Sequence, residues 1–316
     1  MIRMEELRLS ANAVLPVFLM MAAGYLARCL GVLERGDVGK MNRVAFRVFL
    51  PCLLFYNVYR SDLSSAVNGT LIAYAVLGVL TVFAAAYIVV LRLEPLNERR
   101  GVVMQGIFRS NYVILGLPIA QALLGDHELG PVSVLIAIVV PMFNVLAVFV
   151  LERFRGGNVK PGEIAVQVLK NPLVVSSALG IAVLLLGIRL PPILEKTVSG
   201  LGTIATPLQL FLLGAFFRFE GLGRYARALT AVTTVKLVVT PAIFLSLAAV
   251  LGFRGVEFVA LIGVFASPTA VNSFTMVQQM DCGDAELAGD IVIATSAVSV
   301  VSFFLWIWLF KSMGVF

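Results

Sequence analysis

Charged residues are scarce in this sequence, and their scarcity decides the class of protein. Asp, Glu, Lys and Arg make up 13% of the 316 residues, whereas a soluble domain has roughly a quarter. Hydrophobic residues make up 60%, so water cannot be the main solvent of this chain. The net charge of +6 comes from basic residues in short connections between apolar runs, which is the pattern of membrane topology and not of nucleic-acid binding.

Patterns typical of catalytic and metal sites are also missing. The sequence has no HExxH, and its apolar runs contain neither a pair of acidic residues nor a Ser–His arrangement, so we do not expect an enzyme. Cys29, Cys52 and Cys282 show no paired spacing and are interpreted as free thiols. We expect no cofactor and no metal. The single histidine, His127, is expected to be a solvated residue in a connection rather than a proton switch.

Acidic residues are absent from the middle of every apolar run. All Asp and Glu fall in connections or at the ends of runs, including Glu257 and Asp290. A carboxylate relay for protons and a cation cage of Asp or Glu are therefore not expected. A cation site built from backbone carbonyls and hydroxyls stays open.

Long apolar runs fill the rest of the chain, and a helix needs about 20 such residues to span a bilayer. We expect an all-α integral membrane protein of ten transmembrane helices. The first run follows Arg3 and Arg8 as in a signal peptide, but it belongs to the repeat described below and is interpreted as a helix. The ten segments are residues 9–28, 44–59, 70–91, 102–124, 131–151, 164–187, 198–217, 229–251, 256–280 and 291–310.

The distribution of Lys and Arg predicts the orientation. Connections after the first, third, fifth and seventh segments are richer in basic residues than the others. Because basic loops stay in the cytoplasm, we expect both termini on the outer side of the cell (inner or plasma) membrane.

An internal repeat relates the two halves of the chain. A shift of 156 places Pro16, Gly24 and Pro51 on Pro172, Gly180 and Pro207, and it also aligns Phe55 with Phe211. Near the end of each half, residues 126–129 resemble residues 284–287 at a shift of 158. We interpret residues 1–157 and 158–316 as two five-helix repeats. Five is odd, so the second is inverted, as in many secondary transporters, and chance similarity between apolar segments is the alternative.

Two segments in corresponding positions carry a proline in mid-span. Pro118 in segment 102–124 is predicted to free the carbonyl of Ile114, and Pro268 in segment 256–280 that of Val264, because proline has no N–H and clashes with the carbonyl four residues earlier. Gly116 adds backbone freedom beside Pro118. A single proline would suggest an ordinary kink, but two matched ones favour broken helices at a transport site.

Polar residues flank both predicted breaks. Half-helix N-termini carry partial positive charge and free N–H groups, so the site suits an anion. Arg109 adds a full charge, although snorkelling to the inner surface explains it equally well. Lys236 is interpreted as snorkelling. The predicted substrate-binding residues are Arg109, Asn111, Tyr112, Gly116, Pro118, Ser267, Pro268, Thr269, Asn272 and Ser273.

Several of these segments, in their order and spacing, resemble the auxin efflux carrier family in its bacterial branch. The resemblance covers nearly the whole chain and includes residues 24–28, 42–46, 49–55, 109–118, 171–172, 190–192 and 267–272.

The resemblance implies a fold similar to that of bile acid sodium symporters, with two inverted five-helix repeats. Helices 1, 2, 6 and 7 would form a scaffold, and helices 3–5 and 8–10 a transport domain in which helices 4 and 9 cross at their prolines. By motif, Asn111 corresponds to the asparagine at the crossing of plant members, and Asn272 is its counterpart in helix 9. Members without a long central loop include malate and malonate permeases.

The sequence leaves two functions open. The first is a secondary transporter of small organic anions, such as mono- or dicarboxylates, working by elevator-type alternating access. The second is an anion channel or passive pore with the same fold. The expected partners are a small carboxylate, the lipid bilayer and a second copy of the chain, bound through the scaffold helices.

Overall fold

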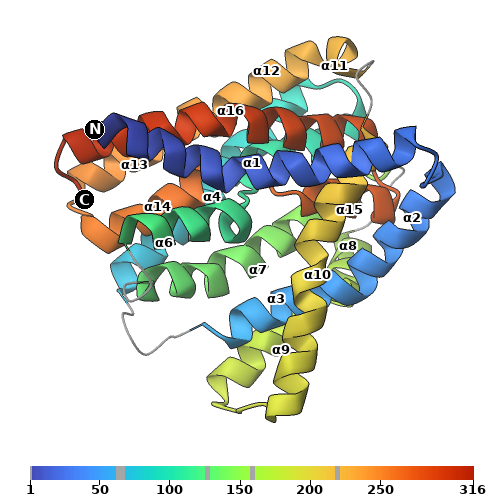
Figure 1. Cartoon of the computed structure of the whole chain (residues 1–316), viewed down its shortest axis with the longest axis horizontal. Coiled ribbons are helices and arrows are strands. Elements are labelled where there is room, and N and C mark those ends of the chain that lie inside the picture. Colours follow the sequence, from blue (N-terminus) through green and yellow to red (C-terminus); the bar gives the residue numbers. More distant parts are fainter. Residues whose placement is uncertain (1, 62–67, 125–128, 157–160, 218–220) are drawn as a thin grey trace.

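The computed structural model describes residues 2–61, 68–124, 129–156, 161–217 and 221–316, and these are helical almost throughout (Figure 1). Residues 126–128 lie outside the described residues. They include His127 and most of segment 126–129, which resembles residues 284–287. The elements are α1 (Ile2–Cys29), α2 (Arg35–Val44), η1 (Ala45–Phe49), α3 (Leu50–Tyr59), α4 (Gly69–Leu93), α5 (Asn97–Phe108), η2 (Tyr112–Gly116), α6 (Leu117–Leu124), α7 (Gly130–Arg153), α8 (Pro161–Lys170), α9 (Pro172–Leu185), α10 (Pro192–Phe216), α11 (Gly221–Arg224), α12 (Ala226–Thr234), η3 (Val235–Val239), α13 (Thr240–Val250), α14 (Gly255–Ala266), α15 (Asn272–Met280) and α16 (Ala285–Ser312). Those labelled η are π-helical turns.

Five helices within the described residues are long and apolar enough to cross a bilayer. These are α4, α7, α10, α16 and the continuous rod α12–η3–α13. The pair α8 and α9, bent by 65°, makes a sixth candidate. The all-helical membrane class is confirmed, whereas the count of ten stays a prediction because the other apolar segments are shorter or interrupted.

Each π-helical turn ends two residues before a proline, namely Pro51, Pro118 and Pro241. A proline ring in an α-helix clashes with the carbonyl four residues earlier. In all three places that carbonyl belongs to the middle of the π-helical turn, where the backbone is wider. The prolines are therefore accommodated without a break in the helix.

Trp306 shows how one freed carbonyl is satisfied. Pro241 cannot bond the carbonyl of Leu237, and the Trp306 indole Nε1 of α16 donates to that oxygen at 2.9 Å. Tryptophan is common at membrane–water interfaces, where its ring lies among the lipid head groups. The half-buried side chain instead joins α16 to η3, because a carbonyl without a partner deep in lipid needs a donor from the protein.

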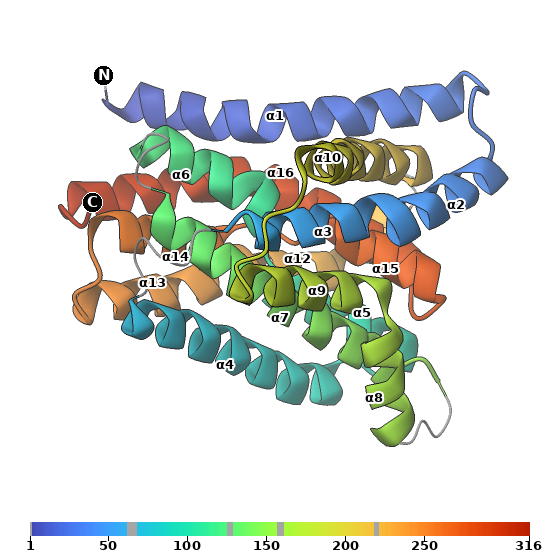
Figure 2. The ribbon, with the colours of Figure 1, turned by 90° about the horizontal axis from the view of Figure 1, so that it is seen from below.

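Close glycine contacts hold α1, α3, α9 and α10 together (Figure 2). A Cβ on Gly24 of α1 would lie 1.8 Å from the carbonyl oxygen of Phe211 in α10. A Cβ on Gly180 of α9 would lie 3.0 Å from the carbonyl oxygen of Phe55 in α3. Small residues permit such backbone contact between membrane helices. The two contacts are equivalent, since a shift of 156 converts Gly24 to Gly180 and Phe55 to Phe211.

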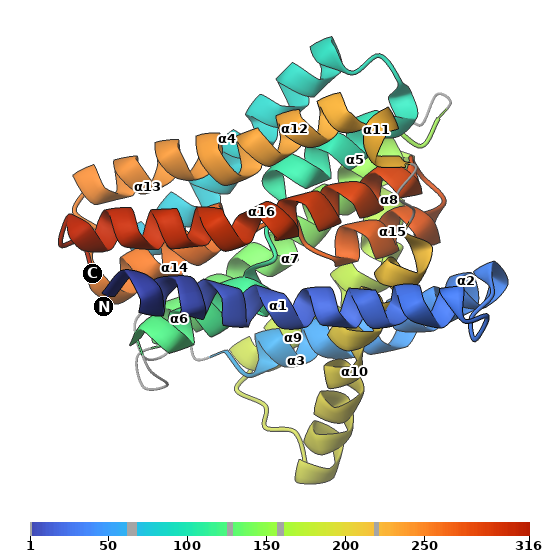
Figure 3. The same ribbon diagram turned by 45° about the horizontal axis from the view of Figure 1, so that its top comes forward.

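The broken helices lie in the interior of the molecule. Residues 101–112 and 258–271 are buried at every position. A helix that is buried on all sides packs against protein and not against lipid. In Figure 3 the rod α12–η3–α13 and the long helix α16 run side by side, and α1 packs against α16.

Candidate functional site

Two helices are interrupted near the centre of the molecule. α5 ends at Phe108 and helical structure resumes at Tyr112, while α14 ends at Ala266 and resumes at Asn272. The bounds of α5, increased by 158, are those of α14. The predicted break at Pro268 is confirmed.

The predicted break at Pro118 is wrong. Pro118 is the second residue of α6, directly after a π-helical turn that accommodates it. The chain leaves the helix nine residues earlier, at Arg109, because Ser110 and Asn111 pair with the other broken helix. Pro118 therefore does not create the interruption that the sequence suggested.

The two breaks cross and hydrogen-bond to each other. Ser110 and Thr269 form an antiparallel bridge, and the backbone N–H of Asn111 donates to the carbonyl of Pro268 at 2.8 Å. The Ser110 hydroxyl donates to the Val264 carbonyl, which Pro268 was predicted to free. In the same way, the Thr269 hydroxyl donates to the carbonyl of Gly106 at 2.8 Å. Each break thus supplies a hydroxyl to a carbonyl of the opposite helix, and the two acceptors again lie 158 residues apart.

Neighbouring residues hold the crossing in place. The backbone N–H of Thr269 donates to the hydroxyl of Thr295 in α16 at 3.2 Å. Gly116 and Gly263 approach closely, since a Cβ on Gly116 would lie 3.1 Å from the Cα of Gly263. The ring of Tyr112 covers both glycines, and its hydroxyl donates to the Val132 carbonyl at 3.4 Å. These contacts connect the crossing to α16 and α7.

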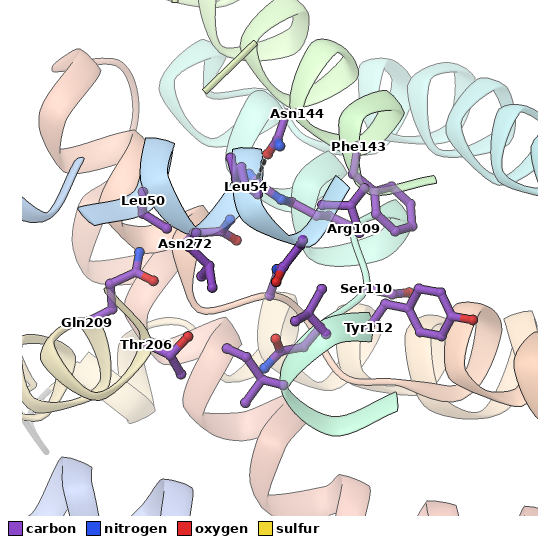
Figure 4. Close-up of a pocket in the computed structure, with 17 residues that line it drawn as sticks. Leu50, Leu54, Arg109, Ser110, Tyr112, Phe143, Asn144, Thr206, Gln209 and Asn272 are labelled. Carbon is purple, nitrogen blue, oxygen red and sulfur yellow. Dashed lines mark hydrogen bonds between the residues drawn. The ribbon is translucent and has the colours of Figure 1, made fainter. Parts of the chain in front are cut away.

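A cavity of about 40 Å³ lies beside the crossing (Figure 4). Its lining comes from α3 and α10 on one side and from η2, α7 and the breaks on the other. η2 and α15 begin at the cavity, and the first N–H groups of a helix have no partner inside the helix. The volume holds a few water molecules and is below the roughly 300–1,000 Å³ of typical ligand pockets.

Arg109 places a cation in this lining. Its side chain is 2% exposed, and Figure 4 shows it extending toward Asn144 of α7, whose Oδ1 accepts from Nη2 at 2.6 Å. Nη1 donates to Gln105 Oε1 at 3.1 Å and also contacts the sulfur of Met276. All three partners are neutral, and no carboxylate within the described residues forms an ion pair with Arg109. The predicted alternative of snorkelling is wrong, because these buried partners keep Arg109 inside the protein.

Amide donors surround the same cavity. The Nδ2 groups of Asn57, Asn111 and Asn144 line it and have no acceptor among the described residues. Arg109 donates to Oδ1 of Asn144, and this bond orients the amide so that its Nδ2 group has no partner among the described residues. A buried donor without a partner costs about 1–3 kcal/mol. A cation and three free donors together favour a ligand that brings acceptor oxygens and negative charge.

Lys236 is the second buried cation, and the expectation that it snorkels is wrong. Its side chain is 1% exposed, and Nζ donates to the hydroxyl of Ser110 at 2.6 Å. Through Ser110 it stands beside the Val264 carbonyl, near the C-terminal end of α14. Helix C-termini carry partial negative charge that a cation stabilises. Lys236 therefore supports the crossing, and it is not part of the cavity lining.

The predicted site residues divide into three groups. Arg109, Asn111, Tyr112 and Asn272 line the cavity. Pro268, Thr269, Ser267 and Gly116 build the crossing, and the Ser267 hydroxyl donates to the Gly263 carbonyl at 2.6 Å. Pro118 and Ser273 lie outside the lining, although the buried Ser273 hydroxyl has no partner among the described residues.

Sequence reasoning missed the polar residues that other helices bring to the cavity. They are Asn57 on α3, Asn144 on α7, and Thr206 and Gln209 on α10. An amide inside an apolar run, such as Asn144, was the available signal. Nothing in the sequence indicated that these three helices meet at the crossing.

Asp290 departs from the expectation that acidic residues mark the ends of runs. α16 begins at Ala285, six residues before the expected start, so Asp290 lies in its second turn. Its side chain is 2% exposed, and its Oδ2 has no partner among the described residues. It is not part of the cavity lining.

Known membrane transport proteins match this sequence along nearly its whole length. Residues 9–307 match the family model described as "Membrane transport protein", which is that of the auxin efflux carriers. An "Uncharacterized transporter" of Methanothermobacter thermautotrophicus is 26% identical over 301 residues, covering 94% of this chain and 97% of the relative. A protein of Rhizobium meliloti named "Putative malonate transporter" is 25% identical over 289 residues, covering 89% and 90%.

Proposed function

Because the chain belongs to the membrane transport protein family of the auxin efflux carriers, we propose that it is a secondary transporter of small organic anions, with mono- and dicarboxylates as the substrate class. The relative in Rhizobium meliloti carries malonate in its name, and malonate is a dicarboxylate of this class. Membership of this family also argues against an enzyme.

The observation that carries the proposal is the buried cation beside three unpaired amide donors in the lining of the cavity. Arg109 offers a positive charge whose hydrogen-bond partners are all neutral, and the Nδ2 groups of Asn57, Asn111 and Asn144 have no acceptor among the described residues. A carboxylate would supply several acceptor oxygens and would also neutralise the buried guanidinium. In this proposal Asn272 and the first N–H groups of η2 complete the site, and Tyr112 forms part of the cavity wall.

We further propose ten membrane-crossing units in two inverted repeats, residues 1–157 and 158–316. Corresponding elements support this arrangement: α4 shifted by 157 coincides with the rod 226–250, and α5 shifted by 158 coincides with α14. The reciprocal glycine contacts and the reciprocal hydroxyl bonds at the crossing have the pattern that a two-fold relation between the halves would produce.

In the proposed mechanism, a scaffold of α1, α2–α3, α8–α9 and α10 stays fixed while the remaining helices carry the anion across the membrane. The cavity supports this division, because one wall comes from α3 and α10 and the other from the crossing and α7. Substrate at such a boundary would change its access when the two bodies slide. We place both termini on the outer side of the cell membrane and a homodimer contact on the scaffold.

The direction of transport follows from the coupling. An inside-negative potential favours exit of an anion by about 2.3 kcal/mol per charge per 100 mV. Efflux of a carboxylate therefore needs no coupling ion, whereas uptake does. Flux measured in both directions with and without a proton or sodium gradient would assign the coupling.

The experiment is flux in proteoliposomes with radiolabelled malonate outside and a panel of mono- and dicarboxylates as competitors. We expect saturable uptake that competing carboxylates inhibit, and faster uptake when unlabelled malonate is preloaded inside. A passive pore would instead give flux that rises linearly with concentration and shows no acceleration by preloading. If no carboxylate moves or competes, the proposed substrate class is wrong.

A further inference from the structure

A second and larger cavity opens at another place, where the end of α4 and the start of α5 meet α12. Its volume is about 370 Å³, roughly nine times that of the cavity at the crossing. That volume lies within the range of ligand pockets, which is about 300–1,000 Å³. In Figure 3, α4 and α12 lie along the same edge of the molecule. This cavity shares no lining residue with the proposed anion site.

The cavity is apolar at one end and basic at the other. Its apolar part is formed by side chains of four elements, among them Val89 of α4, Val103 and Ile107 of α5, Val232 of α12 and Val235 of η3. Arg99, Arg224 and Arg227 stand at the other end, together with one acid, Glu94. Arg99 is paired with Asp284 at 3.3 Å, while Arg224 and Arg227 are exposed. The charge left for a ligand is therefore positive.

Tyr225 fixes the basic end. Its hydroxyl donates to Asp284 Oδ2 at 2.8 Å, and burial raises the pKa of this phenol to about 12, so it stays neutral. The guanidinium groups of Arg99 and Arg224 lie over its ring at 5.1 and 5.3 Å from the centroid. Cation–π contacts of this kind orient arginines without consuming their N–H donors.

The cavity continues onto the exposed apolar surface of α4. Val89 is 48% exposed and Leu93 is 75% exposed, and both belong to α4, a candidate membrane span. The basic end lies where α4 ends and where the rod 226–250 begins, which is the level of the lipid head groups. The excess of basic residues places this end on the cytoplasmic side, where anionic lipids give the membrane surface a negative potential.

We propose that this cavity binds one anionic phospholipid, with the phosphate at Arg224 and Arg227 and an acyl chain along Val89, Val103 and Val235. The basic opening complements the negative charge of a phosphate. The apolar interior and the position at the membrane surface favour a lipid over a soluble anion, because only a lipid also has an acyl chain to fill the apolar part. Val235 precedes Lys236, which holds Ser110 at the crossing, so a bound lipid touches the helix that supports the transport site.

The test is native mass spectrometry of the detergent-purified protein with palmitoyl-oleoyl phosphatidylglycerol and with the matching phosphatidylcholine. We expect phosphatidylglycerol to stay bound at collision energies that remove phosphatidylcholine. Removing each arginine is expected to weaken phosphatidylglycerol binding about fivefold, as for one basic residue near an anionic surface. Arg224→Gln/Arg227→Gln should therefore bind about 25-fold more weakly.

The control is Arg43→Gln/Arg47→Gln, which removes two exposed arginines from α2 and η1, outside the cavity, and should bind like the wild type. A second variant, Ala231→Trp, fills the apolar part without changing charge and should also displace the lipid. Equal binding of the two lipids, or equal binding by the two double variants, would overturn the proposal. Displacement of phosphatidylglycerol by glycerol 3-phosphate at similar concentrations would also overturn it, because the ligand would then be a soluble phosphate.

Discussion

Helices associate in two different ways in this molecule. One region is the glycine layer, formed by α1, α3, α9 and α10, and the other is the crossing of the two broken helices. The layer brings backbones together at glycines, and its helices keep their own hydrogen bonds. The crossing gives up helical bonds and replaces them with bonds between helices, such as that from Asn111 to Pro268. The first solution gives close backbone contact between intact helices, and the second leaves polar groups available for a ligand.

The comparison makes different predictions for the two regions. Substitutions in the glycine layer should lower stability and reduce transport only through loss of folded protein. Substitutions of the free donors at the crossing should reduce transport with little loss of stability.

Gly24→Leu should have the largest effect on stability. The new Cβ would lie 1.8 Å from the Phe211 carbonyl oxygen, so α1 and α10 must separate along their whole contact. Overpacking typically costs 1–3 kcal/mol, and a clash with backbone is expected at about 3 kcal/mol or more. The control is Gly200→Leu, since Gly200 on α10 has nothing within 4 Å of its Cβ position. Thermal unfolding in detergent measures both, and equal midpoints would mean that the glycine contact is not needed.

Asn111→Ala should separate function from stability. Its Nδ2 is a buried donor without a partner among the described residues, so its loss removes no internal side-chain bond there. We expect transport to fall at least tenfold, the loss expected for one hydrogen bond to a charged ligand, about 1.5–3 kcal/mol. The unfolding midpoint should stay the same or rise. Full transport activity in flux assays would show that the substrate binds elsewhere.

Ser110→Ala should destabilise the crossing itself. The hydroxyl accepts from Lys236 and donates to the Val264 carbonyl, and the variant leaves both partners buried without it. The expected loss is about 2 kcal/mol, since an unpaired buried polar group costs about 1–3 kcal/mol. Ser299→Ala is the matched control, because the Ser299 hydroxyl donates only to Ser296 within its own helix. If Ser299→Ala lowers the free energy of unfolding as much as Ser110→Ala does, the hydrogen bonds at the crossing are no more important than those within a helix.

Thr269→Val should have the smallest of these effects. It keeps the shape of the side chain and removes the hydrogen bond to the Gly106 carbonyl. One neutral hydrogen bond contributes about 1 kcal/mol. Thermal unfolding should show this loss, and in the double variant with Ser110→Ala the two losses should not add, because the two bonds hold one crossing. Independent, additive losses would argue against a reciprocal unit.

Much of this architecture could be predicted from the sequence. Low charge and long apolar runs gave the membrane class, and the shift of 156 identified residue pairs that make equivalent contacts, such as Gly24 and Gly180. The break at Pro268 was predictable because proline removes an N–H. The position of the other break was not, since a π-helical turn accommodates Pro118 and the pairing of Ser110 with Thr269 depends on tertiary structure.

The cavity was only half predictable for the same reason. Arg109 and Asn111 stand out as polar residues inside an apolar run. Asn57, Asn144 and Gln209 contribute through helices that are distant in sequence, and a single sequence does not show which helices meet. Lys236 was misjudged because snorkelling is a local argument, whereas its partner Ser110 lies 126 residues away.

The most direct test of the central claim is the thermal stabilisation that malonate and other carboxylates give to purified protein with and without the charge of Arg109. A ligand that binds the folded state raises the unfolding midpoint as its concentration exceeds its Kd. We predict a shift for the wild type and for Arg43→Gln, a smaller shift for Arg109→Lys, and none for Arg109→Gln at the same ligand concentration. A full shift in Arg109→Gln, or no shift with any carboxylate in the wild type, would contradict the account.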